Sequence, residues 1–226
     1  MIRRQVIVLA LAAAIGAAGA NPVMGAKPPT QWDGLMQVPS KKLKLVYLAP
    51  DADFRGYKKV MLDPTEVAFQ KNWAKDYNST RTGLSGRVSD AEVQKVVAKS
   101  IEVSNDIFAQ AMVDAGYPVV TQAGPDVLRV RNGIINISVT APERNDMGRS
   151  HTFSNEAGYA TLVVEVRDSM TGALLGRAVD GRVAGDNGSL MRNRVTNRAD
   201  FRSLVKAWAK HSANGLTELT RRAPGA

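Results

Sequence analysis

Two segments of the chain carry mainly apolar residues at intervals of three and four positions, the spacing that lines up one face of an α-helix. In residues 89–115 this set comprises Val93, Val97, Ile101, Ser104, Phe108, Ala111, Met112 and Ala115. In the segment into which residues 195–199 lead, it comprises Phe201, Leu204, Val205, Trp208, Ser212, Leu216 and Leu219. The pattern predicts two long amphipathic helices, each with one face buried against the rest of the domain.

The ends of the first of these helices are marked in the sequence. Ser89 and Glu92 stand three positions apart, as in a capping box, in which each side chain accepts a hydrogen bond from the other residue's backbone. Gly116 follows the last periodic residue and can adopt the left-handed conformation that ends many helices. A shorter helix is also predicted over residues 65–73, whose apolar residues could anchor it.

Alternation of apolar and polar residues predicts β-strands elsewhere in the chain. The alternation is clearest in residues 160–166. The following segment, Asp168–Gly172, has the composition of a tight turn and predicts a hairpin to a partner strand over residues 173–183. Shorter strands are expected at residues 43–48, 57–62 and 117–121.

Residues 127–140 predict a longer strand whose alternation changes phase. Leu128 and Val130 share one parity, whereas Ile135, Ile137 and Val139 share the other. A change of phase would turn the strand inside out unless a bulge absorbs one residue. We expect this bulge at Asn132-Gly133.

The order of these elements favours an α+β fold. We expect an antiparallel or mixed sheet of about five to six strands, with the two long helices packed on one of its faces. Residues 43–222 are expected to form a single domain. Residues 27–42, which contain several prolines and lysines, are expected to form an extended lead into it.

Residues 1–26 have the layout of a secretory signal peptide. Arg3 and Arg4 precede an uncharged, alanine-rich run, and small residues offer cleavage after Ala20 or Ala26. An uncleaved anchor is the alternative, because the uncharged stretch approaches the length of a membrane span. The chain contains no cysteine, so that it can carry neither a disulfide nor the acylated cysteine of a lipoprotein. We therefore expect a periplasmic protein that has no lipid anchor and, after cleavage, no membrane span.

The chain is basic, with a net charge of +9. A basic protein outside the cytoplasm meets anionic lipids and glycans rather than nucleic acid. The expected partners are therefore an envelope protein or an anionic lipid or glycan surface, and no nucleic acid.

Two stretches and a short motif resemble a known family. They are residues 47–64 (Tyr-Leu-Ala-Pro-Asp-Ala-Asp-Phe-Arg-Gly-Tyr-Lys-Lys-Val-Met-Leu-Asp-Pro), residues 158–172 with their Asp-Ser-Met-Thr-Gly end, and Trp-Asp-Gly-Leu at 32–35. Together they are similar to the bacterial envelope family catalogued as domain of unknown function 3313. The resemblance implies an exported protein, often a lipoprotein, with no established activity and no catalytic residues to carry over.

Candidate site residues are few. Arg182, Arg192, Arg194 and Arg198 form a basic cluster, in part in a loop, that could bind phosphate or acidic groups of a partner. His151 and His211 are expected to be a solvated loop residue and a half-buried packing residue. Asp180-Gly181-Arg182 and Asp186-Asn187-Gly188 are interpreted as turns, since they lack the spaced acids of a calcium loop. No nucleophile elbow, phosphate-binding loop or zinc helix is present, and we expect no metal and no cofactor.

The leading hypothesis is a non-catalytic periplasmic binding or assembly module that meets another envelope protein through its sheet. The alternative is a carrier of a small anionic ligand or lipid, which would require an open pocket between the helices and the sheet. A third hypothesis is a hydrolase in which His151 works with Glu156 or Asp146.

Overall fold

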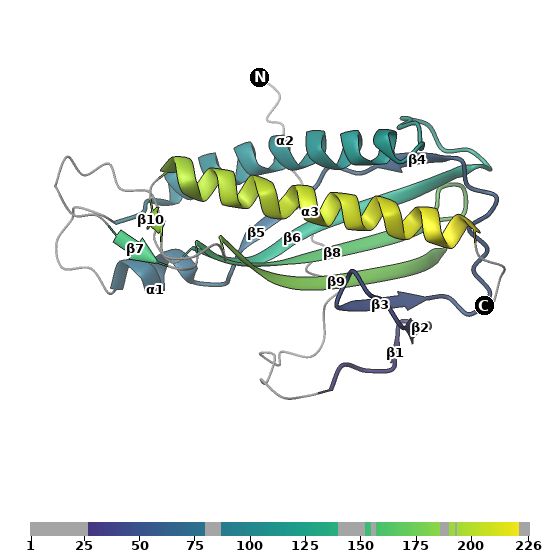
Figure 1. Cartoon of the computed structure of the whole chain (residues 1–226), viewed down its shortest axis with the longest axis horizontal. Helices are drawn as coiled ribbons and strands as arrows, with labels where there is room; N and C mark the ends of the chain where they lie inside the picture. Colours follow the sequence, from purple (N-terminus) through teal and green to yellow (C-terminus); the bar gives the residue numbers. More distant parts are fainter. Residues whose placement is uncertain are drawn as a thin grey trace, which may run out of the picture.

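The computed structural model describes residues 27–79, 87–139, 152–154, 157–185, 190–192 and 194–221. Two layers build the molecule, a long twisted sheet and a layer of two helices that lie side by side over one face of it (Figure 1). The helices are α2 (Asp90–Asp114) and α3 (Arg194–Arg221), and the short α1 (Trp73–Ser79) lies at one end. The expected signal peptide, residues 1–26, lies outside the described residues.

The main sheet is mixed and has eight strands, more than expected, in the order β1-β2-β3-β9-β8-β6-β4, with β5 also paired to β6. The pairs are antiparallel except that β4 and β5 run parallel to β6. A separate two-stranded sheet pairs β7 with β10. The strands are β1 (Gln31–Trp32), β2 (Leu35–Val38), β3 (Leu45–Leu48), β4 (Lys59–Leu62), β5 (Glu66–Phe69), β6 (Val127–Val139), β7 (Thr152–Ser154), β8 (Gly158–Asp168), β9 (Leu174–Ala184) and β10 (Leu190–Arg192). The α+β class with both long helices on one face is confirmed.

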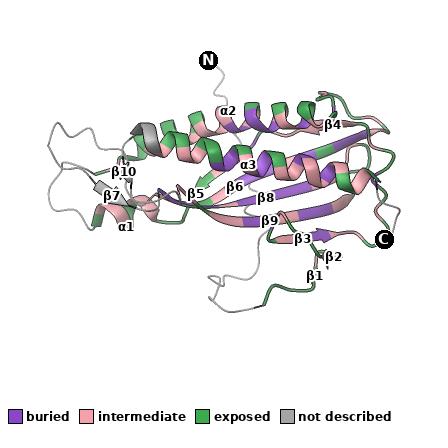
Figure 2. Cartoon of the chain, in the orientation of Figure 1, coloured by how far each residue is buried: buried purple, intermediate pink, exposed green. Residues whose placement is uncertain are grey.

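The core lies between the helices and the sheet, where buried positions gather in Figure 2. Phe108 of α2 and Trp208 of α3 are fully buried against it. Burial of such large apolar side chains is the main source of stability in a domain of this size.

Helix α2 begins as the sequence predicts. The Ser89 hydroxyl accepts a hydrogen bond from the Glu92 backbone N–H, and the Glu92 carboxylate accepts one from the Ser89 backbone N–H at 2.8 Å. These bonds favour the charged carboxylate and lower the pKa of Glu92. Gly116, just beyond the helix, has φ of +91°.

Residues 31–38, within the expected N-terminal lead, belong to the sheet. Strands β1 and β2 form a hairpin in which Trp32 pairs with Leu35. Asp33 and Gly34 between them have φ of +51° and +80°, as a type I′ turn requires. Asp-Gly is a strong signal for this turn, so the hairpin could have been found in the sequence.

The short helix predicted over residues 65–73 is also wrong. Glu66–Phe69 is strand β5, in which Val67 pairs with Ile134 of β6. Helix α1 starts only at Trp73, after Asn72 adopts φ of +63°. Pairing with β6 outweighs the weak local preference for a helix.

The predicted change of phase in β6 is confirmed, but the bulge does not lie at the expected position. The register shifts between Ile135 and Ser138, where Asn136 has φ of +52°, rather than at Asn132-Gly133. Ile134 is therefore buried together with Leu128 and Val130. The expected strand at 117–121 is reduced to an isolated bridge between Val119 and Val60.

The predicted hairpin after β8 is confirmed. The Asp168 carboxylate accepts hydrogen bonds from the backbone N–H groups of Met170 and Thr171, and Gly172 has φ of +73°. Within the described ranges, no helix is both long and apolar enough to cross a membrane.

A candidate ligand pocket between helix α3 and the sheet

A pocket of about 500 Å³ lies under the C-terminal half of α3. Its origin is visible in the pattern of the helix. Gly215 occupies the sheet-facing stripe about two turns after the fully buried Trp208. A Cβ atom added at Gly215 would meet no atom within 4 Å. The helix thus has a glycine at a position where a side chain as large as that of Trp208 would fill the space between helix and sheet.

The opposite wall is built from small and aliphatic residues of the sheet. Gly176 and Ala178 of β9 lie there, with Val46 and Leu48 of β3 and the β8 valines Val164 and Val166. A Cβ at Gly176 would lie 2.9 Å from Leu48 Cδ2 and 3.1 Å from Val166 Cγ2. The glycine in β9 therefore allows these two side chains to approach, and the wall they form is apolar.

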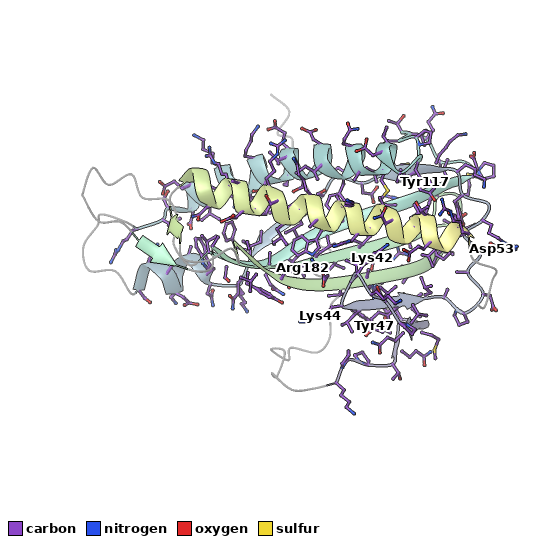
Figure 3. All side chains as sticks on the ribbon, viewed as in Figure 1. Lys42, Lys44, Tyr47, Asp53, Tyr117 and Arg182 are labelled. Atoms are coloured by element: carbon purple, nitrogen blue, oxygen red, sulfur yellow. The ribbon has the colours of Figure 1, made fainter. Side chains whose placement is uncertain are left out.

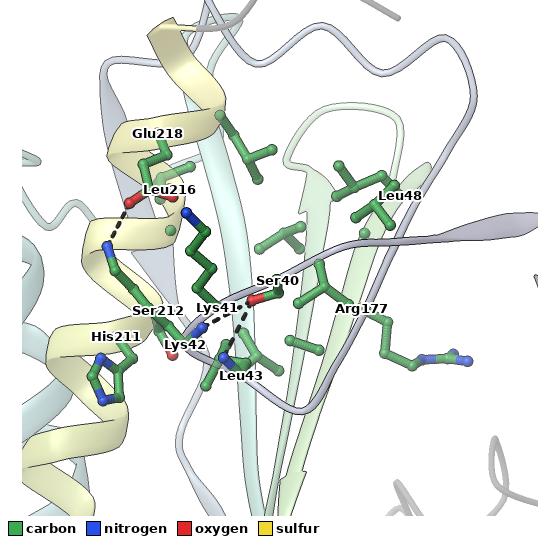
Figure 4. Close-up of a pocket in the computed structure, with 18 of the residues that line it drawn as sticks. Ser40, Lys41, Lys42, Leu43, Leu48, Arg177, His211, Ser212, Leu216 and Glu218 are labelled. Carbon is green, nitrogen blue, oxygen red and sulfur yellow. Dashed lines mark hydrogen bonds and ion pairs between the residues drawn. The ribbon is translucent and has the colours of Figure 1, made fainter. Parts of the chain in front are cut away.

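The connection between β2 and β3 forms one side of the mouth (Figure 4). The Ser40 hydroxyl accepts hydrogen bonds from the backbone N–H groups of Lys42 and Leu43, at 3.3 and 3.2 Å. Lys42 forms an ion pair with Glu218 of α3 across the mouth. Lys41 is exposed beside it and forms no ion pair with any described residue. The mouth therefore carries an excess of positive charge.

Two polar side chains of α3 also line the pocket. The Ser212 hydroxyl is buried and has no hydrogen-bond partner among the described residues. His211 is half-buried, as expected, and its pKa is lowered by burial and by the positive charges of Arg182, Lys42 and Lys210. The lowered pKa favours the neutral imidazole of His211. Both side chains can offer a hydrogen bond to a ligand.

Arg177 touches the pocket but does not supply charge to it. Its side chain points away from the pocket in Figure 4. On the far face of the sheet it donates to Glu165 at 2.6 and 3.0 Å and to Asp33 at 2.8 Å. Its guanidinium also lies 4.2 Å from the centre of the Trp32 ring. The guanidinium therefore links the β1–β2 hairpin to strands β8 and β9.

The four arginines of the predicted basic cluster lie on strands and a helix rather than in a loop. Arg182 lies on β9, Arg192 on β10, and Arg194 and Arg198 on α3. Arg198 is exposed, and the side chains of Arg192 and Arg194 lie outside the described part. Arg182 donates to Asp180 at 2.6 Å and to the Lys42 carbonyl at 2.8 Å, so that it supports the mouth of the pocket (Figure 3).

The interpretation of Asp180-Gly181-Arg182 as a turn is wrong, because the segment lies within β9. Asp180 is buried and accepts hydrogen bonds from the Trp208 indole N–H at 2.9 Å and from the Lys44 backbone N–H at 3.2 Å. His151, Glu156, Asp146 and residues 186–188 lie outside the described residues. In the part that is described, no three His, Cys, Asp or Glu residues are placed to hold a metal ion.

Comparison with known sequences matches residues 30–212 to the family described as "Protein of unknown function (DUF3313)". The chain belongs to this family. The resemblance seen in residues 47–64 and 158–172 is thereby confirmed. The match runs from the β1–β2 hairpin into α3 and ends before Gly215, Leu216, Glu218 and Leu219 of the pocket. No curated protein matches this family member in sequence.

Solved structures show distant similarity to this DUF3313 protein. A DUF330 protein from Xanthomonas campestris is 13% identical with a TM-score of 0.42, over 80% of this chain and 90% of the other. The PelC dodecamer from Paraburkholderia phytofirmans gives 10% and 0.35, over 74% and 95%. A candidate lipoprotein from Caulobacter crescentus gives 10% and 0.31, over 74% and 91%.

The pocket was not predicted from the sequence. Ser212, Leu216 and Leu219 fit the apolar stripe of the last helix, and Gly215 lies between them. Glycine in the interior of a helix costs about 1 kcal/mol relative to alanine, so its presence in a buried stripe is a signal. The matching small residues of β9 could be recognised only once the register was known.

Proposed function

We propose that the protein is a non-catalytic binding module of the bacterial envelope, whose pocket takes the apolar part of an anionic amphiphile such as a lipid with an acyl chain. One observation carries this proposal: an aliphatic pocket opens beside Gly215, with Lys41 and Lys42 at its mouth. A volume of about 500 Å³ lies in the range of small-molecule sites.

The chemistry of the walls favours a hydrocarbon chain. Val46, Leu48, Val164, Val166 and Leu216 offer no hydrogen bonds from their side chains. Release of water from such walls lowers the free energy, so an acyl chain is a favourable replacement. The single unpartnered hydroxyl of Ser212 provides one polar contact within this surface.

The charge of the mouth favours an anionic head group. Glu218 partly neutralises Lys42, whereas the exposed Lys41 has no acidic partner in the described residues. The net charge of +9 adds a general attraction for anions. A carboxylate or phosphate at the mouth would lie near Lys41 while its chain enters the pocket.

Binding rather than catalysis is proposed because His211 lacks a catalytic partner. No hydrogen bond joins it to a carboxylate within the described chain, and a general base needs such an orienting contact. The periplasm is the proposed location, on the strength of residues 1–26. A partner protein of the envelope that delivers the ligand to this protein, or receives the ligand from it, stays a prediction.

The test is binding of a fluorescent fatty acid to the exported protein. Wild type should give saturable fluorescence that dodecanoate displaces and that dodecanol displaces less well. Gly215→Leu should fill the pocket and abolish the signal. Gly56→Leu is the matched control, because a Cβ at exposed Gly56 also meets no atom within 4 Å, away from the pocket. Equal binding by wild type and Gly215→Leu would overturn the proposal.

A further inference from the structure

A second cleft, of about 200 Å³, lies at the other end of the strand order and shares no residue with the pocket under α3. It is bounded by α2, by β6 and by the connection between β4 and β5. The lining residues are Leu62, Asp63, Pro64, Thr65, Asn105, Phe108, Ala109, Val119 and Asn132.

The cleft arises where two strands share one neighbour. Strand β4 pairs with β6 as far as Leu62, opposite Val130, and β5 begins to pair at Glu66, opposite Gly133. The connecting residues Asp63–Thr65 leave Asn132 between these two registers. Pro64 contributes to the gap because it has no N–H to donate to a neighbouring strand.

Asn132 is only 2% exposed, yet neither the oxygen nor the nitrogen of its side-chain amide has a hydrogen-bond partner among the described residues. The Thr65 hydroxyl, also 2% exposed, likewise has no partner in the described part of the chain. Buried polar groups are nearly always hydrogen-bonded, and leaving them without a partner destabilises the fold. The cleft is therefore lined by a residue with both a donor and an acceptor on one planar group and by a residue with a hydroxyl, and the described residues engage none of these side-chain groups.

Thr65 is held in place by a neighbour that does not satisfy its hydroxyl. The side-chain oxygen of Asn105 on α2 accepts a hydrogen bond of 2.7 Å from the Thr65 backbone N–H. The Ser104 hydroxyl, adjacent to Asn105 in the helix, is fully buried and likewise has no partner among the described residues. Asn105 therefore fixes the backbone of Thr65 while the Thr65 hydroxyl stays without a partner among the described residues.

The charges at the rim are already balanced. Asp63 accepts a hydrogen bond from Arg129 at 2.9 Å and lies 3.4 Å from Arg131. Apart from Asn105, the remaining lining residues are apolar and include Leu62, Phe108 and Ala109. The cleft therefore suits an uncharged ligand with a polar edge and an apolar body.

We propose that this cleft is a second binding site, for a small uncharged planar molecule with a primary amide. The amide group would donate to the Asn132 oxygen and accept from the Asn132 nitrogen, with the Thr65 hydroxyl as a further partner. The volume equals that of about six or seven water molecules at roughly 30 Å³ each, which accommodates a ligand of the size of benzamide.

The experiment is an NMR titration of the exported protein with benzamide, followed by a crystal structure with benzamide present. Wild type should show saturable shifts at residues lining the cleft, and benzoate should bind more weakly. Asn132→Leu should abolish the shifts, and Thr65→Val should weaken binding by about tenfold, the effect of one neutral hydrogen bond. Thr65→Val keeps the test decisive if Asn132→Leu does not fold.

Gly215→Leu is the control, because it blocks the other pocket and should leave benzamide binding unchanged. Two results would overturn the proposal: an absence of saturable shifts in wild type, or a crystal structure in which only ordered water contacts Asn132 in the presence of benzamide. Neither result bears on the pocket under α3, so the two proposals fail separately.

Discussion

The indole nitrogen of Trp208 donates a hydrogen bond of 2.9 Å to the carboxylate of Asp180. Both residues are buried. The same carboxylate accepts from Arg182 of its own strand and from the backbone of Lys44, just before β3. One aspartate thus joins helix α3 to two adjacent strands beside the pocket.

Asp180→Ala should destabilise the protein by about 2–3 kcal/mol. The substitution leaves the Trp208 N–H buried without a partner and removes the carboxylate from Arg182, which is partly exposed and can recover some solvation. The free energy of unfolding in urea measures the effect. Asp51→Ala, at an exposed position, is the control and should cost less than about 0.5 kcal/mol. Similar losses in both variants would contradict the role of Asp180.

Gly215→Ala should stabilise the protein by about 0.5–1 kcal/mol. The added methyl group meets open space, and alanine loses less backbone entropy in a helix than glycine does. Gly158→Ala is the opposite case, since its φ is +155° and its Cβ would lie 2.0 Å from the Ser138 carbonyl oxygen. Thermal unfolding should rank the variants with Gly215→Ala above wild type and Gly158→Ala below it. If Gly215→Ala were less stable than wild type, the space beside Gly215 would not be open as described.

Stability should fall in acid because of Glu165. Burial raises the pKa of this carboxyl group, but the hydrogen bonds and charges of Arg177 and then Arg167 outweigh burial and lower it on balance below its ordinary 4.5. A lowered pKa in the folded state gives stability that is present above 4.5 and is lost as the pH falls through the folded-state value. Urea unfolding at a series of pH values measures this loss.

Glu165→Gln should flatten that part of the pH profile, because its side chain does not titrate. Glu102→Gln is the matched control, since Glu102 is exposed on α2 and, among the described residues, forms an ion pair only with Lys99. If Glu165→Gln and wild type lost stability with the same slope below pH 4.5, the acid sensitivity would have another source.

Lys41→Glu should weaken binding of dodecanoate by about three- to tenfold at low ionic strength, because it places a negative charge at the mouth of the pocket. The difference should shrink as salt is added. Lys44→Glu makes the same charge change at an exposed position that does not line the pocket. Equal effects from the two variants in a displacement titration would indicate general attraction rather than a contact at the mouth.

The strongest predictions from the sequence concern elements with signals of their own. Ser89 and Glu92 mark the start of α2 by direct hydrogen bonds between neighbours, and Asp168 and Gly172 do the same for the hairpin. Such contacts depend only on nearby residues, so they can be predicted from the sequence without knowledge of the fold. The Asp33-Gly34 hairpin carries a signal of the same kind.

Other features depend on partners distant in the sequence. Glu66–Phe69 is a strand because β6 lies beside it, and Asp180 is buried because Trp208 covers it. The polar cleft exists because two strands share β6 in different registers. No local pattern contains these relationships, so the candidate sites could not be placed from the sequence.

The ion pair between Asp33 and Arg177 joins residues that are 144 positions apart in the chain. A ribosome makes the first hairpin long before it makes β9, the strand against which β3 must pair. Until β9 is made, the early strands have no sheet to join and their apolar residues no core to enter. We therefore expect this protein to fold late and as a whole, with the unfinished chain dependent on a chaperone for protection from aggregation.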